Sequence, residues 1–585
     1  MTGRAMSALS HSAFTRFRRS VLFPASAASL VLLMASGAAA QNFDPFGTSE
    51  PARSDSGVTR EDLPPSAATQ EGERGVVKEE LDPVMSNDGS GLPYELWSGL
   101  SAEQFAKSIA ALQLPPRSPA LHALWRRLVG SDSTPADGVG NARFTALRVE
   151  ALDQSGLVDE VAAVLAKDPN AERDPLLQAL TARSEIGLGN TERGCEIGKG
   201  LLQVQSQLPK PIQADAILIN GYCAAARGDT AGAALQASLL KELDLGLAGA
   251  DFLDAVANGL TPQIPSDAKL SLLDYRIAAL KGGLDRAKLI RAATPALLAG
   301  LAQDPRGAPD VRLAAGEAAA QLNALSTRDL APLYLLEGAG NDAGSIERAG
   351  LFRSAQSQQT PMQKARLIRA FLDDARRANL YWPSLQLMAP AVRDLEPVPE
   401  IGWFAETAIE VNLASGNFEG VRRWARLGDQ IGAGGQPLAH WIALADIADP
   451  TPTSDRGQSF GALETMARSG RFDPALLHRL ATVLDALDMN VPVPLWEIAS
   501  RSPQPNSGHL PDTGVLSELA DASQKKQFGR TVLLVMRTIG PHGAESAHMI
   551  ALGDALRALK RAGLDAEARQ LALEGLLGAW PRSVS

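Results

Sequence analysis

The sequence predicts an all-α protein, an α-solenoid of stacked helical hairpins, over most of its 585 residues. Three observations lead to this prediction. Ala and Leu dominate the composition and aromatic residues make up only 5%, whereas a large β-sandwich or barrel needs more β-branched and aromatic residues. Apolar residues recur every three or four positions from about residue 93 onward. Breaks that contain glycine separate the helical segments at intervals of 33 and 39 residues, the period of a two-helix repeat.

Residues 1–40 are predicted to be a secretory signal peptide. Arginines without acidic residues come first, an apolar stretch of about 14 residues follows, and Ala38-Ala39-Ala40 ends the segment. The alternative is a membrane anchor, but the stretch is shorter than the ~20 residues that span a bilayer, and Pro24 interrupts it. We expect cleavage after Ala40 and a periplasmic mature chain without a transmembrane segment. The pair Arg18-Arg19 leaves the Sec and twin-arginine export routes both open.

Residues 41–92 are predicted to be a disordered acidic spacer, rich in Pro and Ser. Such a segment has too few large apolar residues to offset the chain entropy that is lost on folding. A partner-binding tail is the alternative. The net charge is −10 for the whole chain and about −14 without the four arginines of the signal peptide. An acidic chain has no general attraction for nucleic acid, so no nucleic-acid partner is expected.

The chain from about residue 93 onward is predicted to be helical throughout. The segment 361–380 illustrates the pattern, because its apolar residues form one stripe and charged residues cover the other side. The best strand candidate, 531–535, is explained equally well by a buried helix. A weak break near 261–266 divides the array into a region 93–265 and a region 266–585. Further Pro-rich breaks at 449–453 and 502–511 are expected to be bends or long loops.

Five hinges share one pattern, in which a glycine closes a helix and a capping residue opens the next one. They contain Gly156, Gly189, Gly228, Gly416 and Gly563. This pattern resembles the tetratricopeptide-like family of helical repeats, most clearly in residues 545–577. The early Trp and later Pro of the fuller family pattern are missing. The resemblance implies stacked hairpins with a concave surface for partners, and it does not identify the partner.

The two cysteines are expected to form a disulfide. Cys195 and Cys223 each lie 14 residues from Pro209, which is at the centre of a predicted turn between two helices. In an antiparallel hairpin, equal distances from the turn place two side chains level with each other, and an oxidising compartment favours their pairing. Two buried free thiols are the alternative.

Aromatic residues concentrate in one part of the array and define a candidate partner-binding surface. Large aromatics in a concave groove can anchor peptides or sugars. At helical spacing they can equally fill the core between hairpins, and both interpretations stay open. The residues are Tyr381, Trp382, Trp403, Trp424 and Trp441.

No catalytic, cofactor-binding or metal-binding constellation stands out in the sequence. His542, Glu545 and His548 are spaced three apart, so they cannot converge from one regular helix. There is no G-x-S-x-G motif and no complete phosphate-binding loop.

The sequence therefore favours a non-catalytic, exported interaction protein that binds proteins of the cell envelope, without a cofactor. The alternative is a protein that binds or processes peptidoglycan with a helical superhelix. An enzyme of that kind would need a lysozyme-like catalytic domain with a catalytic Glu, whereas the last hundred residues are predicted to stay helical.

Overall fold

Helices make up the secondary structure of the part of the chain that the computed structural model describes, which is residues 85, 91–138, 140–340, 342–430, 438–451 and 456–582. These ranges contain 27 α-helices and no β-strand. Helices that follow each other in the chain pack side by side, which confirms the predicted α-solenoid of stacked hairpins. The predicted signal peptide and nearly all of the predicted spacer lie outside the described residues.

The helices follow one another through short turns. The first half of the array contains α1 (Ala102–Ala111), α2 (Pro119–Gly130), α3 (Asn141–Gln154), α4 (Val158–Lys167), α5 (Pro175–Leu188), α6 (Thr191–Leu201), α7 (Lys210–Ala226), α8 (Thr230–Glu242), α9 (Ala248–Ala257), α10 (Leu272–Ala279), α11 (Arg286–Ala292), α12 (Pro295–Gln303), α13 (Pro309–Gln321) and α14 (Thr327–Leu335). The second half contains α15 (Ala343–Ser357), α16 (Pro361–Arg377), α17 (Tyr381–Arg393), α18 (Ala405–Ala414), α19 (Phe418–Gln430), α20 (Ala439–Ala448), α21 (Arg456–Arg468), α22 (Pro474–Ala486), α23 (Val493–Arg501), α24 (Thr513–Gln524), α25 (Phe528–Ile539), α26 (Met549–Arg561) and α27 (Asp565–Leu577), and the short 3₁₀ turns are η1 (Gln205–Gln207), η2 (Pro399–Phe404) and η3 (Ala544–Ser546).

The five predicted hinges are confirmed, because all five glycines adopt the left-handed backbone that closes a helix. Their φ angles lie between 69° at Gly416 and 93° at Gly189. Other hinges have the same backbone without a glycine. Asn323, Asn379 and Asp488 occupy left-handed positions after α13, α16 and α22, with φ between 54° and 59°. Asn and Asp tolerate this region better than other side chains, so these hinges carry no glycine signal in the sequence.

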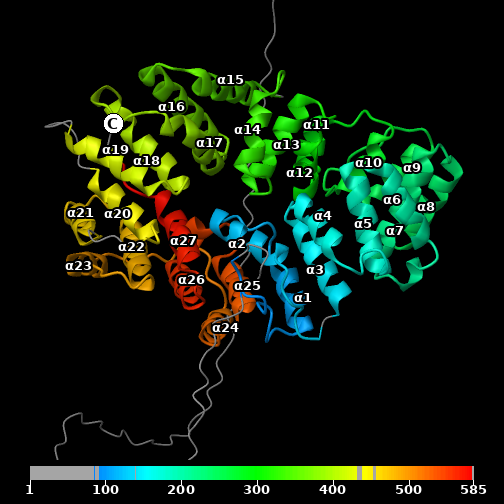
Figure 1. Ribbon diagram of the computed structural model, residues 1–585, viewed down its shortest axis with the longest axis horizontal. Coiled ribbons are helices and arrows are strands. Elements are labelled where there is room, and N and C mark those ends of the chain that lie inside the picture. Colours follow the sequence, from blue (N-terminus) through cyan, green and yellow to red (C-terminus); the bar gives the residue numbers. More distant parts are fainter. Residues whose placement is uncertain are drawn as a thin grey trace, which may run out of the picture. The chain divides into compact units, whose positions relative to one another are not determined.

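Helices α5 to α10 form a bundle on one side of the molecule (Figure 1). Within it α5 packs against α6, α7 and α10, and α9 packs against α7, α8 and α10. These contacts cross the boundary predicted near residues 265 and 266, although the segment between α9 and α10 is irregular. The division into two regions stays a prediction. The predicted break at 502–511 is a loop between α23 and α24.

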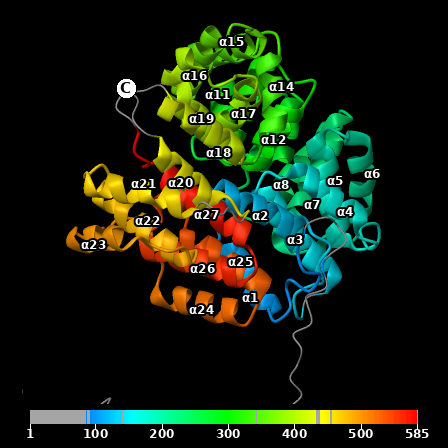
Figure 2. The same cartoon turned by 60° about the vertical axis from the view of Figure 1, so that its left-hand side comes forward.

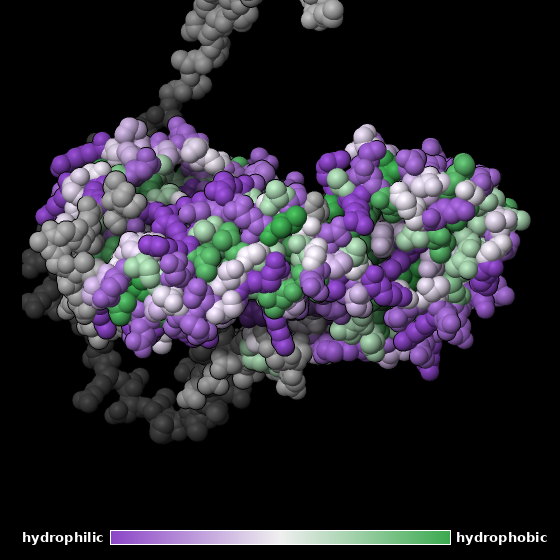
Figure 3. All heavy atoms as spheres, turned by 90° about the horizontal axis from the view of Figure 1, so that it is seen from above, coloured by the Kyte–Doolittle hydropathy of each residue, from purple (hydrophilic) through white to green (hydrophobic). Residues whose placement is uncertain are grey.

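The array closes on itself, which the sequence did not predict. The first helices, α1 and α2, pack against α25 near the end of the chain, and α2 also packs against α27. Figures 1 and 2 both show these N-terminal helices beside α25 and α27. Farther along, α12 packs against α3, α4 and α10. The face in Figure 3 is largely polar, with apolar side chains in small groups.

A disulfide joins α6 to α7, as predicted from the spacing of the two cysteines. Cys195 and Cys223 are bonded, with their Cα atoms 5.7 Å apart and a separation of 28 positions in the sequence. The hydroxyls of Thr191 and Tyr222 are hydrogen bonded at 2.9 Å and join the same two helices.

Reduction of this disulfide is expected to lower the free energy of unfolding by about 3 kcal/mol, because the unfolded chain regains the entropy of an open loop. Urea unfolding with and without reductant measures the change. The double variant Cys195→Ser/Cys223→Ser is the control, and reductant should not alter its unfolding curve. Identical curves for the oxidised and reduced wild type would contradict the prediction.

Candidate functional site

The N-terminal and C-terminal helices meet at a junction that polar contacts hold together. The backbone N–H of Gly529 donates to the carbonyl of Leu96 at 2.8 Å. Arg127 on α2 forms an ion pair with Glu567 on α27. These bonds join residues more than 400 positions apart, so the junction is a product of tertiary structure.

Glu574 on α27 caps the first turn of α2 from the other end of the chain. Its carboxyl group accepts hydrogen bonds from the hydroxyl of Ser118 and, at 2.6 Å, from the backbone N–H of Ala120. Ser118 is the N-cap of α2, where backbone N–H groups lack partners within the helix. Glu574 is only 6% exposed, and burial raises its pKa to about 8 although the two bonds oppose this rise. The side chain therefore holds a proton at neutral pH in the folded protein.

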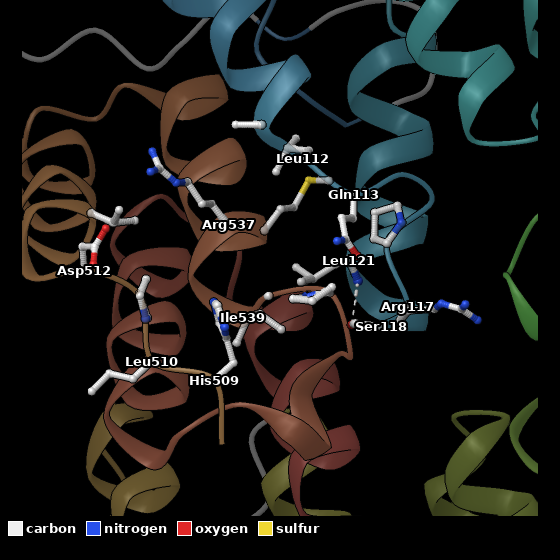
Figure 4. A pocket seen from close by; sticks show the side chains of 17 residues that line it. Leu112, Gln113, Arg117, Ser118, Leu121, His509, Leu510, Asp512, Arg537 and Ile539 are labelled. Atoms are coloured by element: carbon white, nitrogen blue, oxygen red, sulfur yellow. Dashed lines mark hydrogen bonds between the residues drawn. The ribbon is translucent and has the colours of Figure 1, made fainter. Parts of the chain in front are cut away.

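A pocket of about 460 Å³, which we call the junction pocket, lies between the α1–α2 loop, the 509–512 segment and the end of α25 (Figure 4). Figure 4 shows the tips of Arg117 and Arg537 pointing away from its centre, where Ile539 and His509 lie. The lining is mainly apolar, and Leu510 at its edge is 47% exposed. An open apolar pocket with charged residues at its rim suits the apolar side chain of a partner.

His509 is held in place by backbone pairing with another loop. Its N–H donates to the carbonyl of Ser546, and its carbonyl accepts from the N–H of His548, both at 2.8 Å. The imidazole lies directly over Gly540, where a Cβ atom would come within 2.4 Å of the ring. Gly540 also has a φ of 79°, which residues with a side chain rarely adopt. Both the nearby ring and the backbone conformation therefore exclude a side chain at this position.

Two further cavities, of about 540 and 180 Å³, lie on the other side of the 116–119 segment and share five lining residues. We call this pair the central cleft. It is formed by the start of α2, the α3–α4 hinge, the region around Asn323 and the start of α17, with Glu574 and the 542–545 turn at one end. The larger cavity falls in the size range of small-molecule sites, about 300–1,000 Å³.

Two buried polar atoms beside the cleft have no hydrogen-bond partner among the described residues. They are Nε2 of His122 on α2 and Nε1 of Trp382 at the start of α17. Burial and the nearby Arg126 lower the pKa of His122 to about 4, so its ring is neutral. An unpaired buried polar group lowers the free energy of unfolding by about 1–3 kcal/mol, a cost that most buried side chains avoid by forming a hydrogen bond.

The five aromatic residues of the predicted partner-binding surface do not share one surface. Trp424 and Trp441 are fully buried, Tyr381 and Trp382 are partly buried, and Trp403 is 46% exposed. Two of them are bound to carboxylates: the hydroxyl of Tyr381 donates to Glu410 at 2.6 Å and Nε1 of Trp441 donates to Glu406 at 3.0 Å. Trp424 and Trp441 therefore lie in the core between helices, as in the alternative interpretation of these aromatic residues. Trp382 lines the central cleft. A role of any of the five in binding a partner stays a prediction.

The spaced His and Glu motif is divided between two places, because His542 and Glu545 both line the central cleft and His548 does not. His542 lines the central cleft, while Nδ1 of His548 accepts from the N–H of Ile550 as the cap of α26. Within the described ranges, no three His, Cys, Asp or Glu side chains are grouped as metal ligands would be. None of the described helices is long and apolar enough to span a bilayer.

Sequence reasoning missed the junction residues because each lies in an ordinary local pattern. Glu574 sits in a typical amphipathic helix, and Leu510 lies in a Pro-rich segment that was expected only to be a bend or loop. Gly540-Pro541 was the one local signal near the junction pocket, since it marks a turn at the end of α25.

Comparisons with protein-family models, with curated proteins and with solved structures find no match for this chain. A function for the chain must therefore be argued from its own residues and their geometry.

Proposed function

We propose that this chain is a non-catalytic, tetratricopeptide-like protein that is exported to the periplasm and binds other proteins of the cell envelope. The observation that carries the proposal is the junction pocket, an open and mainly apolar pocket of about 460 Å³ between the two ends of a closed helical array. The segment 1–40, with its basic, apolar and small-residue regions, supports export. The acidic segment 41–92 suits a spacer between the array and its surroundings.

The junction pocket suits an apolar side chain from a partner because most of its lining residues are apolar and the tips of its two arginines point away from its centre. Burial of one large apolar side chain contributes roughly 1.5–3 kcal/mol, enough to dominate a modest interface. Leu510 is the natural residue to test. It lines the pocket and is already 47% exposed, so a polar replacement should leave the fold intact.

The substitution Leu510→Asp is expected to reduce recovery of crosslinked envelope partners by at least about tenfold, because a charge would lie in the apolar contact. Mild crosslinking in cells, purification of the tagged chain and mass spectrometry measure the recovery. Leu260→Asp is the matched control, since Leu260 is 62% exposed in the irregular segment after α9. Unchanged partners with Leu510→Asp would reject the pocket, and recovery of the chain alone would reject the function.

N-terminal sequencing of the mature chain from fractionated cells tests export separately. A periplasmic chain that begins at Gln41 is expected. A chain that keeps residues 1–40 in the cytoplasm would contradict the proposal.

The second candidate function is binding to the peptidoglycan of the cell wall. The central cleft favours it, because its lining combines the indole of Trp382 with the amide side chains of Gln321, Asn323 and Gln386.

A further inference from the structure

The charged residues around the central cleft are largely engaged with one another. Arg126 forms an ion pair with Glu160, and Arg127 forms one with Glu567. Arg117 donates to the carbonyl of Gln321 at 3.1 Å. The lining holds these three arginines against five acidic side chains, so an anionic ligand would meet no excess of positive charge there. The acidic residues are Asp159, Glu160, Asp329, Glu545 and Glu574.

Three amide side chains that line the cleft are held in place through their nitrogen atoms. Asn323 donates to the carbonyls of Pro116 and Arg117, Gln321 donates to Ala378, and Gln386 donates to Ala414, at distances between 2.9 and 3.2 Å. These bonds fix each amide through its nitrogen. None of the three amide oxygens accepts a hydrogen bond from the described residues, so three uncharged acceptors remain for the donors of a ligand.

Trp382 lies where the two cavities of the cleft join, and it lines both. Asn323 and Pro383 line both cavities beside it. An indole next to fixed acceptors can pack against an apolar ligand face while hydroxyl groups at the ligand's edge donate to the acceptors.

We infer that the central cleft is a binding site for an uncharged, hydroxyl-rich oligosaccharide, with Trp382 as the packing surface and the amide oxygens of Asn323, Gln321 and Gln386 as acceptors. A sugar ring offers several O–H donors around an apolar C–H face, which matches this lining. A peptide backbone offers only one N–H donor per residue, so it supplies fewer donors to these acceptors than a sugar ring with several hydroxyls. This inference rests on the second candidate function, to which it adds the class of carbohydrate and the residues that bind it. It does not depend on the junction pocket.

Calorimetric titration of the full mature chain tests the inference. The probes are two neutral trimers, maltotriose and triacetylchitotriose, and one anionic trimer, tri-galacturonic acid. At least one neutral trimer is expected to bind with a Kd of about 1 mM or lower. The anionic trimer is expected to bind at least about tenfold more weakly, because the cleft lining holds more acidic side chains than arginines.

Substitution at Trp382 locates the binding. Trp382→Ala is expected to weaken binding of the neutral trimer at least about tenfold, and Trp382→Phe is expected to retain most of it because a ring remains. Trp496→Ala on α23 is the matched control, since Trp496 is 46% exposed and lies outside the cleft lining. Circular dichroism and the urea midpoint establish that each variant folds.

Failure of both neutral trimers to bind would overturn the inference, as would equal binding by the wild type and by a folded Trp382→Ala variant. Equal or tighter binding of the anionic trimer would overturn the argument from charge. None of these results affects the crosslinking test with Leu510→Asp, so this inference and the protein-binding function can fail separately.

Discussion

Replacing Arg479 by alanine is expected to lower the free energy of unfolding by about 4 kcal/mol. Arg479 on α22 donates to four backbone carbonyls, those of Ala544, Glu545, Ala547 and Gly575, at distances from 2.7 to 3.1 Å. These carbonyls belong to η3, to the residue that follows it and to the end of α27. One guanidinium therefore ties three segments together beside the junction.

The large effect is expected because the substitution removes four hydrogen bonds from a charged group and leaves the four carbonyls without that donor. A hydrogen bond to a charged group contributes roughly 1.5–3 kcal/mol, and a buried carbonyl that is left unpaired costs about 1–3 kcal/mol. Desolvation lowers the pKa of Arg479, a sign that the guanidinium is held away from water by these contacts. Partial loss of four bonds, with some water entering, gives the expected magnitude.

Urea unfolding of Arg479→Ala, Arg479→Lys and Arg501→Ala measures the effect. Lysine is expected to recover only part of the loss, because a compact ammonium cannot reproduce the fork of a guanidinium. Arg501 is exposed, and its ion pair with Glu497 on the same helix is long, at 3.9 Å. Its removal should therefore change the free energy of unfolding by less than about 0.5 kcal/mol. Equal effects at positions 479 and 501 would show that the carbonyl contacts contribute little.

Glu574→Gln is expected to flatten the pH dependence of stability between about pH 5 and pH 8. In the folded protein the pKa of Glu574 is about 8, above its ordinary value of 4.5, because the side chain is buried. A folded pKa above the unfolded one gives stability that is fully present below about pH 4.5. That stability is lost as the pH rises to about 8, because the unfolded chain releases the proton first. The loss at pH 8 is about 4 kcal/mol.

Glutamine keeps an acceptor for the N–H of Ala120 and carries no titrating proton. The variant should therefore match the wild type near pH 5 and be more stable near pH 8 by several kcal/mol, on the order of the 4 kcal/mol above. Urea midpoints at pH 5, 6.5 and 8 measure the difference. Asp153, Asp215, Asp274 and Glu410 also have a raised pKa, but they titrate in both proteins and cancel in the comparison. Glu545 is different, because its charge contributes to the raised pKa of Glu574. Parallel pH profiles for the two proteins would contradict the prediction.

Local features of the fold were predictable because they depend on residues close in sequence. Gly563 marked the turn between α26 and α27, and the spacing around Pro209 placed the two cysteines level. Hinges at Asn323 and Asp488 were missed because asparagine and aspartate also occur at helix starts and on helix surfaces. Trp424 and Trp441 could not be assigned to core or surface from sequence, because helical spacing is the same for both.

The sequence by itself determined the all-α class, the hairpin hinges and the pairing of Cys195 with Cys223, since apolar periodicity and backbone preferences act over a few residues. Only the tertiary structure decided that the array closes, that Glu574 caps α2, and that the junction pocket and the central cleft exist. The physical reason is geometric. Each hairpin adds a small rotation, and only their sum over the whole array determines whether the two ends meet.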